Sequence, residues 1–200
     1  MYEVYGSPRS RAFRVLWMLE EIGVPYTHVD AAPRSPEIFK LNPLGKVPVL
    51  VAEGQAITDS SAILTFLADK HGALTFPPGT LERARQDGHF HFVLDELDSL
   101  LWTVAHHSFG LPEKLRVPAV KDSAREEFRT SLDRLLARIE GPFLMGETMT
   151  IADIVAVHCI GWAVVAKFPL EQDGVKAYSK ALRERPAYKR AQATGQRQTA

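Results

Sequence analysis

The sequence predicts an α/β region followed by an all-helical region. In the first third, short strand-like runs alternate with runs whose apolar residues have helical spacing, whereas helical spacing alone recurs in the rest of the chain. A segment rich in proline and glycine, residues 76–80, separates the two patterns. Such segments interrupt regular structure, so we expect a first domain at residues 1–76 and a second at 82–200.

The elements expected in the first domain follow the order β-α-β-α-β-β-α. Ser10 precedes an apolar run that closes at Gly23, and serine and glycine favour the start and the end of a helix, respectively. Gly72 ends the last helix in the same way. The expected strands are 2–5, 26–31, 47–52 and 55–58, and the expected helices start after Ser10 and span 36–41 and 60–71.

The second domain is expected to contain two long amphipathic helices and a buried central one. Apolar residues recur at helical spacing from Phe90 to Val104 and again from Phe128 to Ile139, with prolines between the two runs. Thr150 and Asp153 have the spacing of a capping box. The helix that they open is apolar on nearly all sides, so we expect it at the centre of this domain.

The composition excludes several classes of partner. Lys+Arg and Asp+Glu both number 24 in 200 residues, so the chain shows no basic footprint for nucleic acid. The longest apolar stretch, residues 154–166, contains a histidine and is too short to span a bilayer, so no membrane partner is expected. Cys159 is the only cysteine, which excludes an intrachain disulfide and fits a reducing, cytoplasmic location.

The spacing of the histidines predicts no metal site. His89 and His91 are two residues apart and therefore lie on different faces of a helix, and His106 and His107 are adjacent. We interpret Cys159 as a small buried residue of the core.

The segment 41–61 gives the strongest indication of a ligand site. A turn containing Pro43 and Gly45 leads into a strand whose second residue is Pro48, which has no N–H to donate. Asp59 then precedes a second apolar helical run, in the position of an N-cap. The first N–H groups of a helix and its partial positive charge attract carboxylates. Together these features predict a site for a small, extended ligand that resembles a peptide.

Four segments resemble the cytosolic-type glutathione S-transferases, including the bacterial ones. They are the run 7–26, which begins Ser7–Pro8–Arg9–Ser10–Arg11, the run 42–50, the pair Asp59–Ser60, and the run 146–153. Each segment alone is weak evidence, but the four together in this order and spacing are strong evidence. They extend over nearly the whole chain. The resemblance implies a thioredoxin-like first domain, an all-helical second domain and a homodimer.

The resemblance also implies which residues bind glutathione as co-substrate. Val47 pairs its backbone with the cysteinyl unit, and Pro48 is the cis proline beside it. Lys46 meets the glycyl carboxylate. Ser60 binds the γ-glutamyl carboxylate through its hydroxyl and N–H, and Asp59 binds the ammonium group. The family most often has glutamate where this chain has Asp59, which is one methylene shorter.

Activation of the glutathione thiol requires a hydrogen-bond donor beside the sulfur, because a free thiol has a pKa of roughly 8.5 and the thiolate is the nucleophile. Ser10, at the expected start of the first helix, is the first candidate, and Arg11 adds positive potential there. A cap without a catalytic role is an equally good interpretation of Ser10. Ser7 and Tyr5 are the alternatives, at the positions that resemble the serine and tyrosine of other classes in the family.

By analogy with the family, Trp102, His106 and Phe109 line the pocket for the electrophile. The predicted function is conjugation of glutathione to electrophilic apolar compounds. Glutathione-dependent peroxide reduction, isomerisation or dehalogenation on the same site is an alternative. A third interpretation, from a different class, is a binding or interaction protein with this fold and little turnover.

Overall fold

We describe the chain from a computed structural model, in which residues 1–194 are described. The contacts divide it into two compact units. One unit comprises Met1–Pro78 together with the segment that begins at Arg183, and the other comprises Gly79–Leu182. The domain ranges 1–76 and 82–200 stay a prediction, and the end of the second range, residues 195–200, lies outside the described residues.

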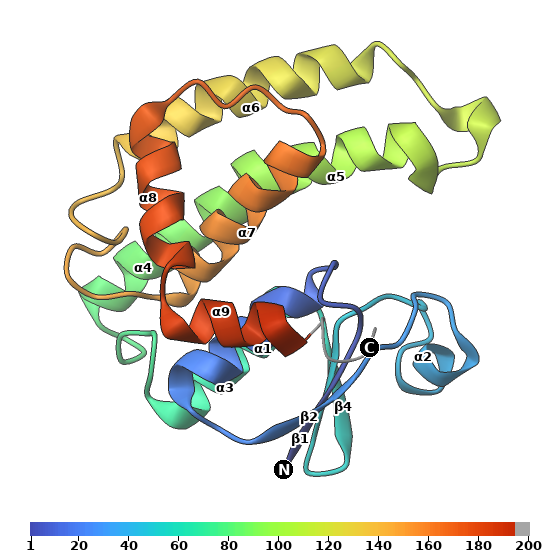
Figure 1. Ribbon diagram of the computed structural model, residues 1–200, viewed down its shortest axis with the longest axis vertical. Coiled ribbons are helices and arrows are strands. Elements are labelled where there is room, and N and C mark those ends of the chain that lie inside the picture. The colour runs from blue at the N-terminus through green and yellow to red at the C-terminus, as the bar shows by residue number, and fades with distance from the viewer. Residues whose placement is uncertain (195–200) are drawn as a thin grey trace. The chain divides into compact units, whose positions relative to one another are not determined.

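The first unit is an α/β fold, as predicted (Figure 1). Its four strands form one sheet in the order β2-β1-β3-β4, in which β1 runs parallel to β2 and antiparallel to β3. Such a mixed sheet with flanking helices is the architecture of a thioredoxin-like domain. The elements are β1 (Tyr2–Tyr5), α1 (Ala12–Ile22), β2 (Tyr26–Val29), α2 (Pro36–Leu41), β3 (Val49–Ala52), β4 (Gln55–Thr58), α3 (Ser60–His71) and α9 (Pro186–Thr194).

Three boundaries differ from the sequence prediction. Strand β2 ends at Val29 rather than at residue 31, because the Ala31 N–H donates to the Val29 carbonyl and the chain turns there. Strand β3 begins at Val49, one residue after Pro48, since proline has no N–H for the ladder. Helix α1 begins at Ala12, so that Arg11 rather than Ser10 is its N-cap residue.

Helix α1 forms the centre of this unit, because every residue from Ala12 to Leu19 is buried. Its outer face packs against α9 at the end of the chain, where the Tyr188 ring lies 5.0 Å from the rings of Phe13 and Trp17. Two ion pairs flank this contact, Arg185 with Glu21 and Arg190 with Glu20, with nitrogen–oxygen distances of 2.6 Å. The C-terminal helix therefore completes the first unit, although the sequence places it more than 100 residues beyond the Pro- and Gly-rich segment.

Gly6 directly follows β1 and lies against Val47, in the segment that precedes β3. It has a φ of +131°, and a Cβ added there would lie 3.0 Å from the Cβ atoms of both Ala12 and Val47. Both neighbours are short side chains fixed to the backbone, so neither can move aside. Gly6 therefore permits the close approach of α1 and Val47 that the unit requires.

We expect Gly6→Ala to lower the free energy of unfolding by on the order of 2 kcal/mol, from the unfavourable φ and the two close contacts. Urea unfolding followed by circular dichroism measures this. Gly88→Ala is the matched control, because Gly88 lies inside a helix with open space where a Cβ would stand. Alanine there should be neutral or stabilising by up to about 1 kcal/mol. Equal effects of the two substitutions would contradict the assignment of Gly6.

The second unit is helical, as predicted. The first long helix expected from the sequence contains two π-helical segments, which apolar spacing did not reveal. The elements are α4 (Leu81–Val93), the π-helix η1 (Leu94–Asp98), α5 (Ser99–Ala105), the π-helix η2 (His106–Gly110), the 3-10 helix η3 (Glu113–Leu115), α6 (Val120–Leu136), α7 (Ile151–Val165) and α8 (Asp173–Arg183).

Helix α7 is the buried core of this unit, which confirms the prediction from its apolar composition. All seven residues from Ile151 to Val157 are buried. The expected capping box is also confirmed, since the Asp153 carboxylate accepts the Thr150 N–H at 2.7 Å. Helix α6 ends at Leu136, three residues before the end of the apolar spacing. Among the described residues, no helix is both long and apolar enough to cross a bilayer.

Candidate functional site

The first part of the candidate site is the turn that precedes β3. The Val47–Pro48 peptide bond is cis, as the resemblance implied. Lys46 is exposed, Val47 is half-buried and Pro48 is buried. The turn is held by Asn42, whose side-chain amide donates to the Lys46 carbonyl at 2.9 Å and accepts the Leu44 N–H at 3.1 Å. Asn42 is 5% exposed and thereby fixes the backbone that carries Lys46 and Val47.

The second part is the N-terminus of α3. Asp59 has a φ of +71° and caps the helix through its Oδ1 atom, which accepts the N–H groups of Ser61 at 2.8 Å and Ala62 at 3.3 Å. The Ser61 hydroxyl donates to the same oxygen. Desolvation opposes ionisation of Asp59, but these donors and the charge of Arg14 outweigh it and lower the pKa. Within residues 1–194, no residue donates to Oδ2, so this oxygen is available to a ligand.

Ser60 follows Asp59 and is held from below by an arginine. Its side chain is 3% exposed, and its Oγ atom accepts a hydrogen bond of 3.2 Å from Nη1 of Arg14 on α1. Arg14 is completely buried. Sequence reasoning assigned no role to Arg14, although an arginine inside the apolar run of residues 13–19 was a signal that it serves a buried polar group.

The third part is the end of β1, which carries Tyr5, and the segment between β1 and α1, which carries Ser7 and Ser10. The Tyr5 hydroxyl donates to Glu3 Oε2 at 2.6 Å, and this hydrogen bond with the nearby negative charge raises the pKa of Tyr5 to about 12. The Ser10 hydroxyl donates to the Ser7 carbonyl at 2.7 Å and accepts the Ala12 N–H at 3.1 Å. The Ser7 hydroxyl accepts the Arg9 N–H at 3.3 Å. Within the described part of the chain, Ser7 is therefore the one candidate whose hydroxyl donates to no other residue.

These three parts contact each other within the first unit. Gly6 lies against Val47, so the segment after β1 adjoins the cis-proline turn. Arg14 of α1 bonds to Ser60, so the start of α1 adjoins the start of α3. The predicted residues Ser7, Ser10, Arg11, Val47, Pro48, Asp59 and Ser60 thus come from segments that the fold brings together, and Lys46 lies on the exposed side of the turn.

The residues predicted to line the electrophile pocket lie in the second unit, and the structure brings only some of them into contact. The rings of Trp102 on α5 and His106 on η2 are 4.3 Å apart, and both side chains are half-buried. The Trp162 ring of α7 extends this group, 6.3 Å from Trp102. Phe109 is 72% exposed. The adjacent histidine, His107, is committed to the chain itself, because its Nδ1 accepts the Val117 N–H at 3.0 Å.

Two family models match this chain. The one described as the glutathione S-transferase N-terminal domain matches residues 9–70, and the one described as the glutathione S-transferase C-terminal domain matches residues 118–192. Their matches cover most of the chain and both of its units. The chain belongs to the glutathione S-transferase family.

Curated relatives agree with this assignment. "Glutathione S-transferase 3" of Schizosaccharomyces pombe is 32% identical over 79% of this chain and 64% of its own length. "Glutathione S-transferase GST-4.5" of Xanthomonas campestris is 33% identical over 68% of this chain and 69% of its own length. "Elongation factor 1-gamma 3" of Oryza sativa is 25% identical over 92% of this chain, which spans about half of that protein, 47%.

Solved structures match nearly the whole length of the chain. A glutathione transferase from Methylococcus capsulatus has a TM-score of 0.86 and 26% identity, covering 98% of both chains. The glutathione transferase URE2P6 from Phanerochaete chrysosporium, solved in complex with oxidized glutathione, has a TM-score of 0.80 and 26% identity, covering 98% of this chain and 96% of that one. These matches confirm the predicted combination of a thioredoxin-like and a helical domain.

Proposed function

We propose that this protein is a glutathione transferase that activates the glutathione thiol as a thiolate and adds it to electrophilic apolar compounds. The observation that carries the proposal is the meeting of the Ser7–Ser10 turn, the cis Val47–Pro48 bond and the capped start of α3 in one unit. Binding and activation of a thiol-containing tripeptide require a hydrogen-bond donor to the sulfur, a backbone partner for the extended peptide and a site for its carboxylate. Glutathione as the ligand is supported by the glutathione S-transferase relatives and by the solved structure of URE2P6 with oxidized glutathione.

In this proposal each segment binds one part of glutathione. Val47 and Pro48 bind the cysteinyl backbone, and Lys46 binds the glycyl carboxylate. Ser60 binds the γ-glutamyl carboxylate, for which the first N–H groups of α3 add favourable dipoles. The available Oδ2 of Asp59 binds the ammonium group, while Oδ1 caps the helix. This division of the two oxygens lets the shorter aspartate serve both the helix and the ligand.

Thiolate formation follows from the donors around the sulfur. The start of α1 contributes about 0.3 to 2 kcal/mol to an adjacent anion, and a hydroxyl that donates to a charged group contributes on the order of 1.5 to 3 kcal/mol. At about 1.36 kcal/mol for each pKa unit, these effects lower the thiol pKa by roughly one to three and a half units. The thiolate is then the main species near neutral pH. Arg11 adds positive potential at the same place.

Two serines compete for the role of donor. Ser10 lies nearest the start of α1, but its hydroxyl already donates to the Ser7 carbonyl. The Ser7 hydroxyl makes no such donation within the described residues, which favours Ser7 because it loses no existing bond when it turns to the sulfur. Tyr5 is disfavoured, since its hydroxyl is bonded to Glu3.

We expect alanine at the donor serine to lower kcat/KM for conjugation of a chloronitroarene by about 100- to 1,000-fold, the usual loss for one donor to a catalytic anion. Ser7→Ala, Ser10→Ala and Tyr5→Phe are compared by steady-state kinetics, with calorimetry of glutathione binding. The donor variant should also shift the rate profile to higher pH, because its bound thiol ionises later. Wild-type rates in both serine variants, with loss only in Tyr5→Phe, would contradict the assignment.

A second function is a binding role with little turnover, and the elongation factor 1-gamma relatives favour it. Glutathione binding in calorimetry without turnover of chloronitroarenes or hydroperoxides supports this function. Turnover of hydroperoxides alone supports peroxide reduction on the same site. Isomerisation and dehalogenation are each tested by assaying turnover of a substrate of that reaction.

The proposal extends to the surroundings of the site. Trp102, His106 and Phe109 supply the apolar and polar surface for the electrophile. We propose a homodimer in the cytoplasm, where glutathione is abundant and where the single cysteine, Cys159, stays reduced.

A further inference from the structure

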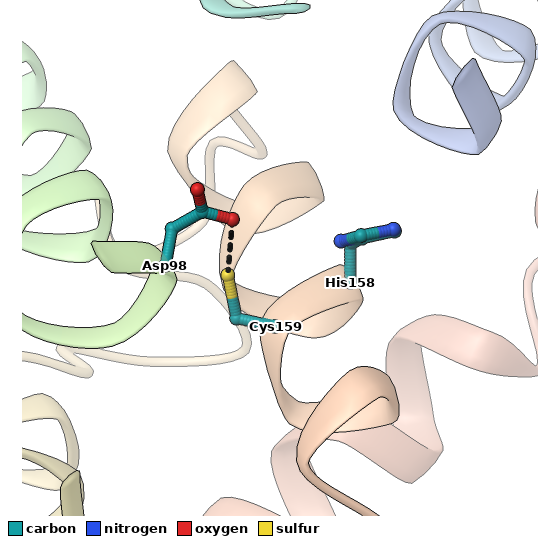
Figure 2. A group of neighbouring side chains, drawn as sticks. All are labelled: Asp98, His158 and Cys159. Atoms are coloured by element: carbon teal, nitrogen blue, oxygen red, sulfur yellow. Dashed lines mark hydrogen bonds between the residues drawn. The ribbon is translucent and has the colours of Figure 1, made fainter. Parts of the chain in front are cut away.

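Three side chains with different metal-ligand chemistry converge inside the helical unit. Asp98 is the last residue of the π-helix η1, and His158 and Cys159 are consecutive residues of α7 (Figure 2). One ligand atom from each, a carboxylate oxygen, an imidazole nitrogen and the thiol sulfur, lies within 4.8 Å of the other two. The Cys159 Sγ donates to Asp98 Oδ1 at 3.5 Å.

The fold creates this cluster from segments 60 residues apart in the sequence. Helix α7 is the buried core of the unit and packs along α4, η1 and α5. Asp98 comes from the π-helical interruption, and π turns inside helices are frequent at functional sites. An acidic side chain is thereby brought against the core helix beside its single thiol.

The donor set matches zinc. Thiolate, imidazole and carboxylate all bind Zn²⁺, at about 2.3, 2.0 to 2.1 and 2.0 to 2.2 Å. Around one tetrahedral ion such atoms are roughly 3.5 Å apart, so the observed group must contract by about 1 Å through side-chain rotation. Because thiolate is a soft ligand, the set disfavours Mg²⁺ and Ca²⁺, which take oxygen ligands.

We propose that Asp98, His158 and Cys159 form a binding site for Zn²⁺, with water as the fourth ligand. Cys159 is buried, whereas Asp98 and His158 are half-buried, so the ion and its water reach the site from the side of the latter two. On binding, the Cys159 S–H bond breaks, the zinc–sulfur bond forms and the proton leaves to solvent. Asp98 then exchanges its hydrogen bond with the thiol for a bond to the metal.

The test uses Co²⁺ as a spectroscopic probe for zinc on the full chain, without glutathione. Cys159 is the only cysteine, so a thiolate-to-cobalt charge-transfer band can come from no other residue. We expect this band, with visible bands of tetrahedral intensity, to saturate at one ion per chain, and added Zn²⁺ to abolish both. Saturation without a charge-transfer band, or no saturation, would overturn the proposal.

Variants identify the ligands. We expect Cys159→Ser to abolish the charge-transfer band. We expect His158→Ala and Asp98→Asn each to weaken zinc binding by at least about 10-fold, since the loss of a residue that only hydrogen-bonds to a metal ligand already costs that much. His91→Ala is the matched control, an exposed histidine of the same unit, and should bind like the wild type. Circular dichroism without metal shows whether each variant is folded. A folded His158→Ala that binds zinc like the wild type, or an equal loss in His91→Ala, would overturn the assignment.

Discussion

Replacing Asp153 by alanine is expected to lower the free energy of unfolding by about 3 to 5 kcal/mol, the range for breaking a buried charged network. Asp153 is fully buried and accepts four hydrogen bonds. Its Oδ1 accepts the Leu144 N–H at 2.9 Å and the Tyr178 hydroxyl at 2.8 Å. Its Oδ2 accepts the Thr150 N–H at 2.7 Å and the Thr150 hydroxyl at 3.2 Å.

This side chain joins the start of α7 to the loop that precedes it, through Leu144 and Thr150, and to α8, through Tyr178, which lies 25 residues further along the chain. Burial raises the pKa of Asp153, and the donors from Leu144, Thr150 and Tyr178 work in the opposite direction. Alanine leaves these donors without an acceptor in a site that water does not reach, and each unsatisfied buried group costs about 1 to 3 kcal/mol. Burial and the negative carboxylate together raise the pKa of Tyr178 well above its ordinary value, so its hydroxyl remains a donor.

Urea unfolding of Asp153→Ala measures this loss. Asp122→Ala is the control, because the Asp122 side chain is 88% exposed and its ion pair with Arg125 is long, at 3.6 Å. Substitution of such a surface residue usually changes stability by less than about 0.5 kcal/mol. A similar small effect of Asp153→Ala would show that the network does not hold the unit together.

Replacing Arg14 by methionine is the second change with a large expected effect. Methionine keeps most of the side-chain volume of arginine. It removes the charged group that donates a hydrogen bond of 3.2 Å to Ser60 Oγ. A hydrogen bond from a charged group contributes on the order of 1.5 to 3 kcal/mol, so glutathione affinity should fall by roughly 10- to 100-fold. This prediction rests on the proposed role of Ser60 in binding the γ-glutamyl carboxylate.

Calorimetry with two ligands separates positioning of Ser60 from a general loss of structure. The variant should lose affinity for glutathione but much less for an analogue that lacks the γ-glutamyl α-carboxylate. Arg9→Met is the control, since Arg9 is exposed and precedes the same helix. An equal loss for both ligands would contradict the role of Arg14 in positioning Ser60, and unchanged glutathione binding would contradict it also.

The sequence predicted the order of elements in the first unit because each carries a local signal. Gly23 and Gly72 end α1 and α3 with the positive φ that glycine adopts readily. Asp59 caps α3, as its position before an apolar run indicated. Local signals are weaker at the start of α1, where two tight turns through Ser7 and Ser10 delay the helix to Ala12.

Side-chain partners far apart in the sequence were not predicted. Arg14 was missed because its partner, Ser60, lies 46 residues away, and no local pattern connects them. The cluster of Asp98, His158 and Cys159 was missed for the same reason, since Asp98 lies 60 residues before the first of the other two and no local pattern connects it to them. The packing of α9 on α1 was also unforeseen, because amphipathic spacing shows that a helix has a buried face but not what covers it.

The sequence by itself determined the family, the two kinds of domain and the segments that form the candidate site, because turn, cap and periodicity signals are encoded locally. The tertiary structure alone decided which hydroxyls are already engaged, which arginine supports Ser60 and which carboxylate accepts the hydrogen bond of Cys159. These depend on distances between side chains that come together only when the apolar faces are buried, and burial is a property of the whole fold.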